Sequence, residues 1–238
     1  MSQSDKKQKK KINKQSKNRR QRLQAISRIG VMTAVLVVCS QISIPLPGSV
    51  PLSLQTFAIA LLAWTLTPGQ AFYCVLVYLL LGSAGLPVFA GFQGGFARLA
   101  GPTGGYLLGF LPMALLLSLA GQILNRHRYP AATSTVGADH PNRQSSSSTA
   151  HKPLVRATGI PLVTAASILS LSGLFCCHCI GVLWLGRQAH ISLLSAAATG
   201  SFPFIIKDII SLVVAALLAG LIHKRFAALR EGQQAVLD

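Results

Sequence analysis

The sequence has little charge. Only 11% of its 238 residues are Asp, Glu, Lys or Arg, against about 25% in an ordinary soluble domain. Acidic residues number only five, while hydrophobic residues make up 51%. The chain also lacks a GxxxxGK run followed by Ser or Thr, the glycine-rich loop that cradles nucleotide phosphates, so nothing in it can hydrolyse ATP. These features indicate an integral membrane protein that draws any energy it needs from elsewhere.

The long apolar stretches predict an all-α fold, a bundle of six transmembrane helices. Crossing about 30 Å of hydrocarbon as a helix takes about 20 apolar residues. The second and third stretches are shorter, and only residues 67–70 separate them, so we expect a tight helical hairpin there. The predicted helices span residues 26–46, 51–66, 71–86, 103–124, 158–185 and 202–222.

The basic residues are arranged by membrane topology. Nineteen of the 22 Lys and Arg residues fall within 1–28, 125–157 and 224–238, whereas the opposite loops carry only Arg98 and Arg187. The positive-inside rule therefore predicts a multi-pass protein of the cytoplasmic membrane with both termini and the 125–157 loop in the cytoplasm. The net charge of +17 follows this pattern, which argues against binding to nucleic acid.

The two ends of the chain are predicted to be cytoplasmic tails. Residues 1–25 are too polar to pack, so we expect a disordered basic tail that is attracted to anionic lipid headgroups. A twin-arginine signal at Arg19 and Arg20 is the sharper alternative, as is a lipoprotein signal ending at Cys39. Both are disfavoured, because five more hydrophobic segments follow and the bulky Val38 precedes Cys39.

The five cysteines all fall inside apolar segments, so they imply no disulfide framework. The run Cys-Cys-His-Cys at 176–179 has the composition of a metal site. Consecutive helical residues point about 100° apart, however, and cannot close on one ion without unwinding the helix. We expect no metal there and no cofactor in the protein.

Small residues recur at four-residue spacing in the first, fourth and sixth predicted helices, and such faces let backbones approach closely in a membrane. For the fourth helix we expect packing inside the bundle. For Gly30 and Ala34, docking onto another membrane subunit is an equally open reading. The sets are Gly30 and Ala34; Gly101, Gly105 and Gly109; and Ser211, Ala215 and Ala219.

Polar residues inside the apolar segments mark the expected binding site. Asp208 is the only acidic residue in these segments, and Lys207 lies beside it. A charge near the bilayer centre costs roughly 2.5 to 3.5 kcal/mol, so such residues usually face a cavity and a partner. With the N-terminus inside, the second, fourth and sixth helices all begin at the outer surface. Their beginnings carry Gln55 and Thr56, Thr103 and Tyr106, and Lys207 and Asp208.

The predicted outer loop from Gly85 to Tyr106 alternates glycines with Phe89, Phe92 and Phe96. This composition suits a lid whose aromatic rings cover an apolar ligand while its glycines allow closure. A passive connecting loop is the alternative.

Several segments carry a family resemblance. ISIPLPGSVPLSLQTFAIALLA at 42–63, YLLLGSAGLPVFAGFQGG at 78–95 and LAGPTGGYLLGF at 99–110 resemble the BioY family, the biotin-binding S components of energy-coupling factor (ECF) transporters. PFIIKDIISLVVAALLAG at 203–220 is similar more weakly. The resemblance implies a six-helix subunit that captures biotin and works with a separate transmembrane coupling subunit and two ATPases.

The last helix departs from the family pattern. The resemblance implies an acidic residue followed three positions later by lysine, but Ser211 stands there and Lys207 precedes Asp208 instead. Residues four apart lie one turn apart on the same face, so Lys207 is a candidate cation for the biotin carboxylate. Arg98 in the loop is the competing cation.

Two other functions are open from the residues alone. One is a proton-coupled carrier that acts without partners, with Asp208 as its proton site. The other is an intramembrane enzyme using His178 or a cysteine, which is weaker because only one carboxylate is at hand and His178 has no visible partner to orient it.

Overall fold

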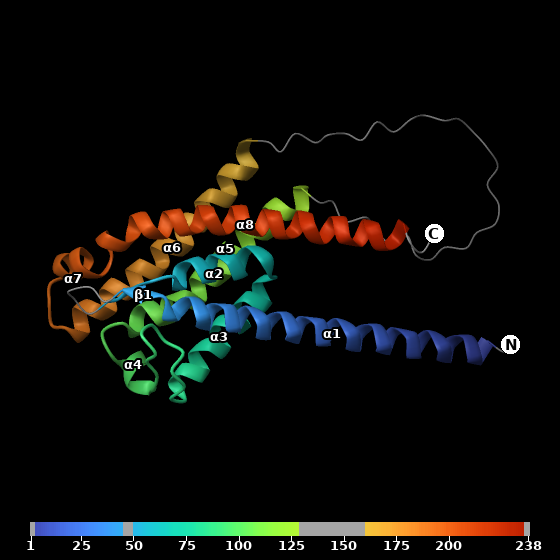
Figure 1. Ribbon diagram of the computed structural model, residues 1–238, viewed down its shortest axis with the longest axis horizontal. Helices are drawn as coiled ribbons and strands as arrows, with labels where there is room; N and C mark the ends of the chain where they lie inside the picture. The colour runs from blue at the N-terminus through green and yellow to red at the C-terminus, as the bar shows by residue number, and fades with distance from the viewer. Residues whose placement is uncertain (1–2, 45–49, 129–159, 236–238) are drawn as a thin grey trace.

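The protein is an elongated helical bundle with two short strands (Figure 1). The computed structural model describes residues 3–44, 50–128 and 160–235. In chain order its elements are α1 Gln3–Gln41, β1 Ser43–Ile44, β2 Leu52–Ser53, α2 Gln55–Thr65, α3 Pro68–Ser83, α4 Phe96–Ala100, α5 Gly104–Arg128, α6 Ile160–Gln188, α7 Leu193–Gly200 and α8 Phe202–Ala235.

The predicted all-α membrane fold is confirmed. Helices α1, α5, α6 and α8 are long and apolar enough to cross a membrane, and α2 and α3 are shorter apolar helices. These six correspond to the six predicted segments. The sequence did not predict α4, α7 or the antiparallel pair β1–β2. Three prolines, Pro45, Pro47 and Pro51, lie between the first two helices, and proline disfavours helix, which fits the described residues 42–44 and 50–54 being outside any helix.

The beginning of the chain differs from the prediction. Residues 1–25 were expected to be a disordered tail, but α1 is helical from Gln3 onward. Lys, Arg and Gln are good helix formers, and the apolar half of α1 provides a formed helix from which these residues extend it. At 1.5 Å per residue, its 39 residues reach about 58 Å, so α1 is much longer than a membrane is thick.

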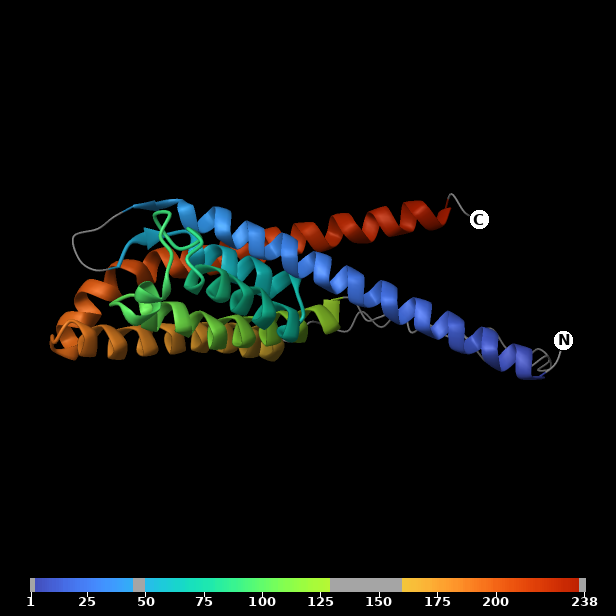
Figure 2. The same ribbon diagram turned by 90° about the horizontal axis from the view of Figure 1, so that it is seen from below.

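The two ends of the chain lie at one end of the bundle. Figures 1 and 2 show the N-terminal half of α1 and the C-terminal part of α8 projecting from the same end. α8 continues as helix to Ala235, so most of the predicted 224–238 tail is helical as well. Helices α4 and α7 lie at the opposite end (Figure 1). Most of the 125–157 loop, from residue 129 onward, lies outside the described residues.

The helical pair α2–α3 forms the predicted tight hairpin, with only Leu66 and Thr67 between the two helices. Pro68 is the first residue of α3, where its missing N–H costs nothing. The side chain of Gln70 accepts a hydrogen bond from the Thr67 N–H at 3.4 Å and caps the helix. α2 itself contacts α1, α3, α5 and α8 and lies at the centre of the core.

Small residues hold α5 against α6. A Cβ atom at Gly105 would collide with the Trp184 side chain, and one at Gly109 would approach Cys177 within 3.0 Å. Packing inside the bundle, expected for this face, is confirmed at both positions. Gly101 precedes α5 and instead accepts a hydrogen bond from Trp184 Nε1 through its carbonyl at 2.9 Å.

On α8, the predicted small-residue face Ser211, Ala215 and Ala219 is buried. Ala215 and Ala219 belong to the same core cluster as most of α2, the helix against which α8 packs.

Candidate functional site

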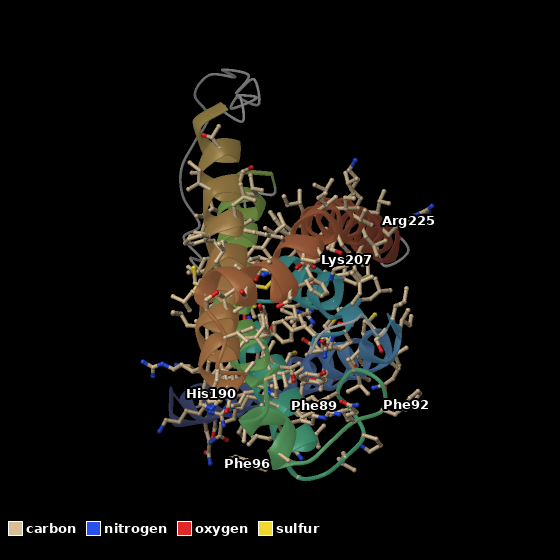
Figure 3. The ribbon with its side chains drawn as sticks, turned by 90° about the vertical axis from the view of Figure 1, so that its left-hand side faces the viewer. Phe89, Phe92, Phe96, His190, Lys207 and Arg225 are labelled. Carbon is tan, nitrogen blue, oxygen red and sulfur yellow. The ribbon has the colours of Figure 1, made fainter. Side chains whose placement is uncertain are left out.

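A pocket lies among the ends of α2, α5, α6, α7 and α8 and the loop that contains α4. Residues from all of these segments line it. Figure 3 looks onto the α7 end of the bundle, with Lys207 and Phe89 among its labelled residues. All seven residues predicted to bind substrate line this pocket: Gln55, Thr56, Arg98, Thr103, Tyr106, Lys207 and Asp208.

Asp208 is the centre of a buried polar cluster, with only 3% of its surface exposed. Its Oδ1 accepts a hydrogen bond from Thr56 Oγ1 at 2.6 Å and pairs with Lys207 Nζ at 2.5 Å. Its Oδ2 lies 3.2 Å from His178 Nε2. Lys207 Nζ also donates to Thr56 Oγ1 at 2.7 Å and to the Ser53 carbonyl at 2.9 Å. The cluster is therefore densely hydrogen-bonded, as a buried charge requires.

The start of α2 provides two further stabilising features for this carboxylate. Thr56 lies in the first turn of α2, so Asp208 approaches the helix end where the partial charge is positive. The β1–β2 pairing sets Ser53 opposite Ser43 and brings its carbonyl to Lys207. Local backbone geometry thus positions the Thr56 hydroxyl as a donor to Asp208 and the Ser53 carbonyl as an acceptor for Lys207.

Gln55 lines the pocket, but its amide is already in use. Its Oε1 accepts a hydrogen bond from Ser53 Oγ at 2.9 Å, and its Nε2 donates to the Tyr78 hydroxyl at 2.6 Å. The residue therefore ties the start of α2 to α3. Tyr78 in turn packs edge-on against Phe89, with ring centroids 5.4 Å apart.

Sequence reasoning missed the role of His178 and of Ser201. His178 Nε2 faces Asp208, and its Nδ1 lies 2.9 Å from Ser201 Oγ, which lies 3.1 Å from the Tyr106 hydroxyl. The expectation that His178 has no partner is wrong. The position of His178 on its helix could have indicated this role. Cys177 and Gly181 form the face of α6 that packs on α5, and His178, next to Cys177, lies at the edge of that face beside the pocket.

Arg98, half-buried in α4, offers the pocket an uncommitted cation. Within the described part of the chain, its guanidinium has no hydrogen-bond or ion-pair partner. α4 itself is tied to α6 through the side chain of Gln188, which donates to the Ala100 carbonyl. Lys207, by contrast, already contacts three acceptors.

The lid over the pocket stays a prediction, and one of its three aromatic rings lies at the pocket. Phe89 is 3% exposed and lines the pocket, but Phe92 and Phe96 are 71% and 70% exposed and do not cover it. Phe92 has a positive φ of 58°, and its N–H donates to the Gln41 side chain at 2.8 Å. This contact fixes the backbone of the loop to α1 and leaves the Phe92 ring exposed (Figure 3).

The Cys-Cys-His-Cys run does not form a joint ligand set. Cys177 is buried and its Sγ approaches the Tyr106 carbonyl at 3.7 Å, whereas Cys176 and Cys179 are only partly buried. Over the described residues, no group of three or more His, Cys, Asp or Glu side chains could hold a metal ion.

Gly30 and Ala34 are both exposed on α1. A Cβ atom at Gly30 would meet nothing within 4 Å. The bundle therefore does not use this face for its own packing.

Comparison with known proteins gives consistent results. Residues 8–228 match the model of the BioY family. The biotin transporter BioY of Thermotoga maritima is 33% identical over 197 residues, 83% of this chain and 94% of that protein. Biotin transporter BioY2 of Lactococcus lactis is 32% identical over 81% of this chain and 86% of that protein.

A solved structure has the same fold. It is the crystal structure of the S-component for biotin from an ECF-type ABC transporter, with a TM-score of 0.65 and 23% sequence identity over 86% of this chain and 93% of that one. Fold, pocket and sequence relationship lead to one conclusion: this chain belongs to the BioY family.

Proposed function

We propose that this chain captures biotin and serves its uptake as the substrate-binding subunit of an ECF-type ABC transporter. One observation carries the proposal: within a BioY-family fold, Asp208, Lys207 and Thr56 converge in one pocket. The relatives in T. maritima and L. lactis are named biotin transporters. A transporter subunit, rather than an enzyme built on His178 or a cysteine, is the function that these relationships support.

The pocket matches the three chemical parts of biotin. The ureido ring presents N–H donors, for which the Asp208 carboxylate is a strong, charge-assisted acceptor. The apolar thioether ring suits the aromatic walls formed by Phe89, Phe110 and Phe204. The carboxylate tail needs a cation, and Arg98 supports this role better than Lys207 because its guanidinium is uncommitted among the described residues.

ATP hydrolysis in such a transporter must be supplied by other subunits, because the sequence has no phosphate-binding loop. The partners are a transmembrane coupling subunit and ATPase subunits. The exposed Gly30 and Ala34 on α1 suit close docking of a partner helix, since small residues let two backbones approach.

The orientation follows from charge. α1 and α8 project their basic ends from one end of the bundle, and α4 and α7 lie at the other (Figure 1). The positive-inside rule places the basic end, with both termini, in the cytoplasm. The pocket then opens toward the outer face of the cytoplasmic membrane.

One experiment tests ligand and carboxylate recognition together: isothermal titration of the purified chain with biotin and with biotin methyl ester. Saturable biotin binding that weakens for the ester supports the proposal, and absence of biotin binding refutes it. A stand-alone proton-coupled carrier is the alternative that a buried carboxylate also permits. Uptake measured with intact and with ATPase-inactive partners separates the two, because only the carrier continues without ATP hydrolysis.

A further inference from the structure

A chain of polar contacts leads from Asp208 to the Tyr106 hydroxyl across the pocket wall. Asp208 Oδ2 lies 3.2 Å from His178 Nε2, and His178 Nδ1 lies 2.9 Å from Ser201 Oγ. Ser201 Oγ lies 3.1 Å from the Tyr106 hydroxyl. Ser201 is 4% exposed and stands between α7 and α8, so the chain joins α8, α6 and α5 through one buried hydroxyl.

The direction of every hydrogen bond in this chain depends on the proton at His178. The Asp208 carboxylate, already paired with Lys207, only accepts, so His178 Nε2 carries a proton. In the neutral imidazole Nδ1 is then bare and accepts from the Ser201 hydroxyl. The Ser201 oxygen accepts from Tyr106 in turn. Because the Tyr106 hydroxyl donates its hydrogen to Ser201, its oxygen can only accept a hydrogen bond from a ligand.

A second proton on His178 reverses this order. Nδ1–H then donates to Ser201, and the Ser201 hydroxyl turns its hydrogen toward the Tyr106 oxygen. The Tyr106 hydrogen is released toward the pocket. The protonation of one histidine therefore changes Tyr106 from an acceptor into a donor, without a change in the fold.

We propose that His178 is a positioning residue for ligand capture: it orients the Asp208 carboxylate and, through Ser201, sets whether Tyr106 accepts or donates toward the pocket. This inference rests on the proposed function for the identity of the ligand. It assigns no contact between His178 and biotin.

Few other titratable or charged groups surround the imidazole. α8 contributes Asp208 and Lys207, α5 contributes Tyr106, whose ring centroid is 6.1 Å from that of His178, and α6 itself contributes Cys177. Arg98 lines the same pocket from α4. Residues 55–65 of α2 and 193–200 of α7 contain no titratable side chain.

Two substitutions test the two ring nitrogens of His178 separately. The amide of His178→Gln reaches the position of Nε2 and keeps a donor for Asp208, so the affinity should stay within about threefold of the wild type. The shorter His178→Asn reaches Ser201 but not Asp208 and should bind about tenfold more weakly. His223→Gln, whose parent bonds only the Ala219 carbonyl of its own helix among described residues, is the matched control and should bind as the wild type does.

The relay through Ser201 has its own test. Ser201→Ala should weaken binding in the wild type, but should add less than about twofold in a Tyr106→Phe background, because coupled residues are not additive. Equal losses in both backgrounds would overturn the relay. Equal losses for the Gln and Asn variants would overturn the role of His178.

A ligand-free measurement keeps this inference distinct from the proposed function. The ¹⁵N shifts of the His178 ring, assigned by comparison with His178→Gln, should report the Nε2–H tautomer and should move in Ser201→Ala. This result supports the network even if the wild type does not bind biotin, in which case only the proposed ligand fails. An Nδ1–H tautomer, or shifts that ignore Ser201→Ala, would refute the inference whatever the protein binds.

Discussion

The Gln41 side chain, at the end of α1, accepts a hydrogen bond from the Phe92 N–H at 2.8 Å. Its amide nitrogen donates to the Val88 carbonyl at 3.1 Å, and the neighbouring Ser40 hydroxyl donates to the same carbonyl at 2.5 Å. The outer loop that presents Phe89 to the pocket is thus fastened to the helix that carries the exposed face of Gly30 and Ala34.

Gln41→Ala should loosen this loop. The Phe92 N–H and the Val88 carbonyl lose a partner, at a net cost of about 1 kcal/mol for each hydrogen bond, so the bound ligand should dissociate about tenfold faster. Stopped-flow or filter-binding release of radiolabelled biotin measures the rate. Gln24→Ala, at an exposed site on the same helix, is the control and should release biotin at the wild-type rate. Unchanged release from Gln41→Ala would show that Phe89 and its packing hold the loop without α1.

Asp208→Asn should keep the fold and weaken biotin at least about tenfold, because a charge-assisted hydrogen bond is worth about twice a neutral one. The amide oxygen of the variant still accepts a hydrogen bond from Thr56, so the bundle should stay folded. The thermal unfolding temperature of the variant checks this. Ser211→Ala, at a buried residue one turn further along α8 that lies outside the lining of the pocket, is the control. Wild-type affinity in Asp208→Asn would show that the Asp208 carboxylate does not bind biotin.

Arg98→Ala and Lys207→Ala should differ in their response to the ligand tail. Because the Arg98 guanidinium is uncommitted among the described residues, its loss should weaken biotin about tenfold but leave the methyl ester nearly unchanged. Lys207 supports the buried cluster, so its loss should weaken both ligands alike. Titration of each variant with both ligands measures this difference, with the exposed Arg187→Ala as control. A selective loss for Lys207 instead would make it the carboxylate partner.

Replacing Gly30 and Ala34 with Leu should separate capture from uptake. The added side chains meet open space in this chain but would push a docked helix away. Cells that supply the coupling subunit and ATPases should bind biotin at the surface and accumulate several-fold less inside. Val38→Leu, on the exposed surface of the same helix, is the control. Normal uptake would show that the coupling subunit docks elsewhere. Loss of biotin binding in detergent would show that the face of Gly30 and Ala34 packs inside the bundle.

Removal of residues 2–18 should leave biotin affinity unchanged. Residues 3–18 belong to the part of α1 that projects from the end away from α4 and α7 (Figure 2). The basic residues from Arg19 to Arg28 remain and should preserve the orientation. Titration measures affinity, and protease protection in sealed vesicles measures orientation. A shortened chain that inserts normally but binds more weakly would contradict the placement of the pocket at the opposite end.

The sequence by itself determined the class of protein and the helix ends at which the site lies. Hydrophobic length gave six helices, and basic residues gave a topology in which Gln55, Thr103 and Asp208 begin their helices at one level; all three line the pocket. Such inferences succeed because a bilayer imposes one length and one charge rule on every segment. The sequence also predicted that Gly105 and Gly109 of α5 pack inside the bundle, since small residues at this spacing allow close helix contact whichever helix packs there.

Only the tertiary structure decided which side chains meet. His178 and Ser201 lie 23 residues apart, and nothing local in the sequence shows that they form a chain of polar contacts with Asp208 and Tyr106. The Phe92 N–H bonds the side chain of Gln41, 51 residues earlier, and Lys207 bonds the carbonyl of Ser53, 154 residues before it. Hydrogen bonds act over about 3 Å, so partners distant in sequence become visible only when the packed helices bring their side chains together.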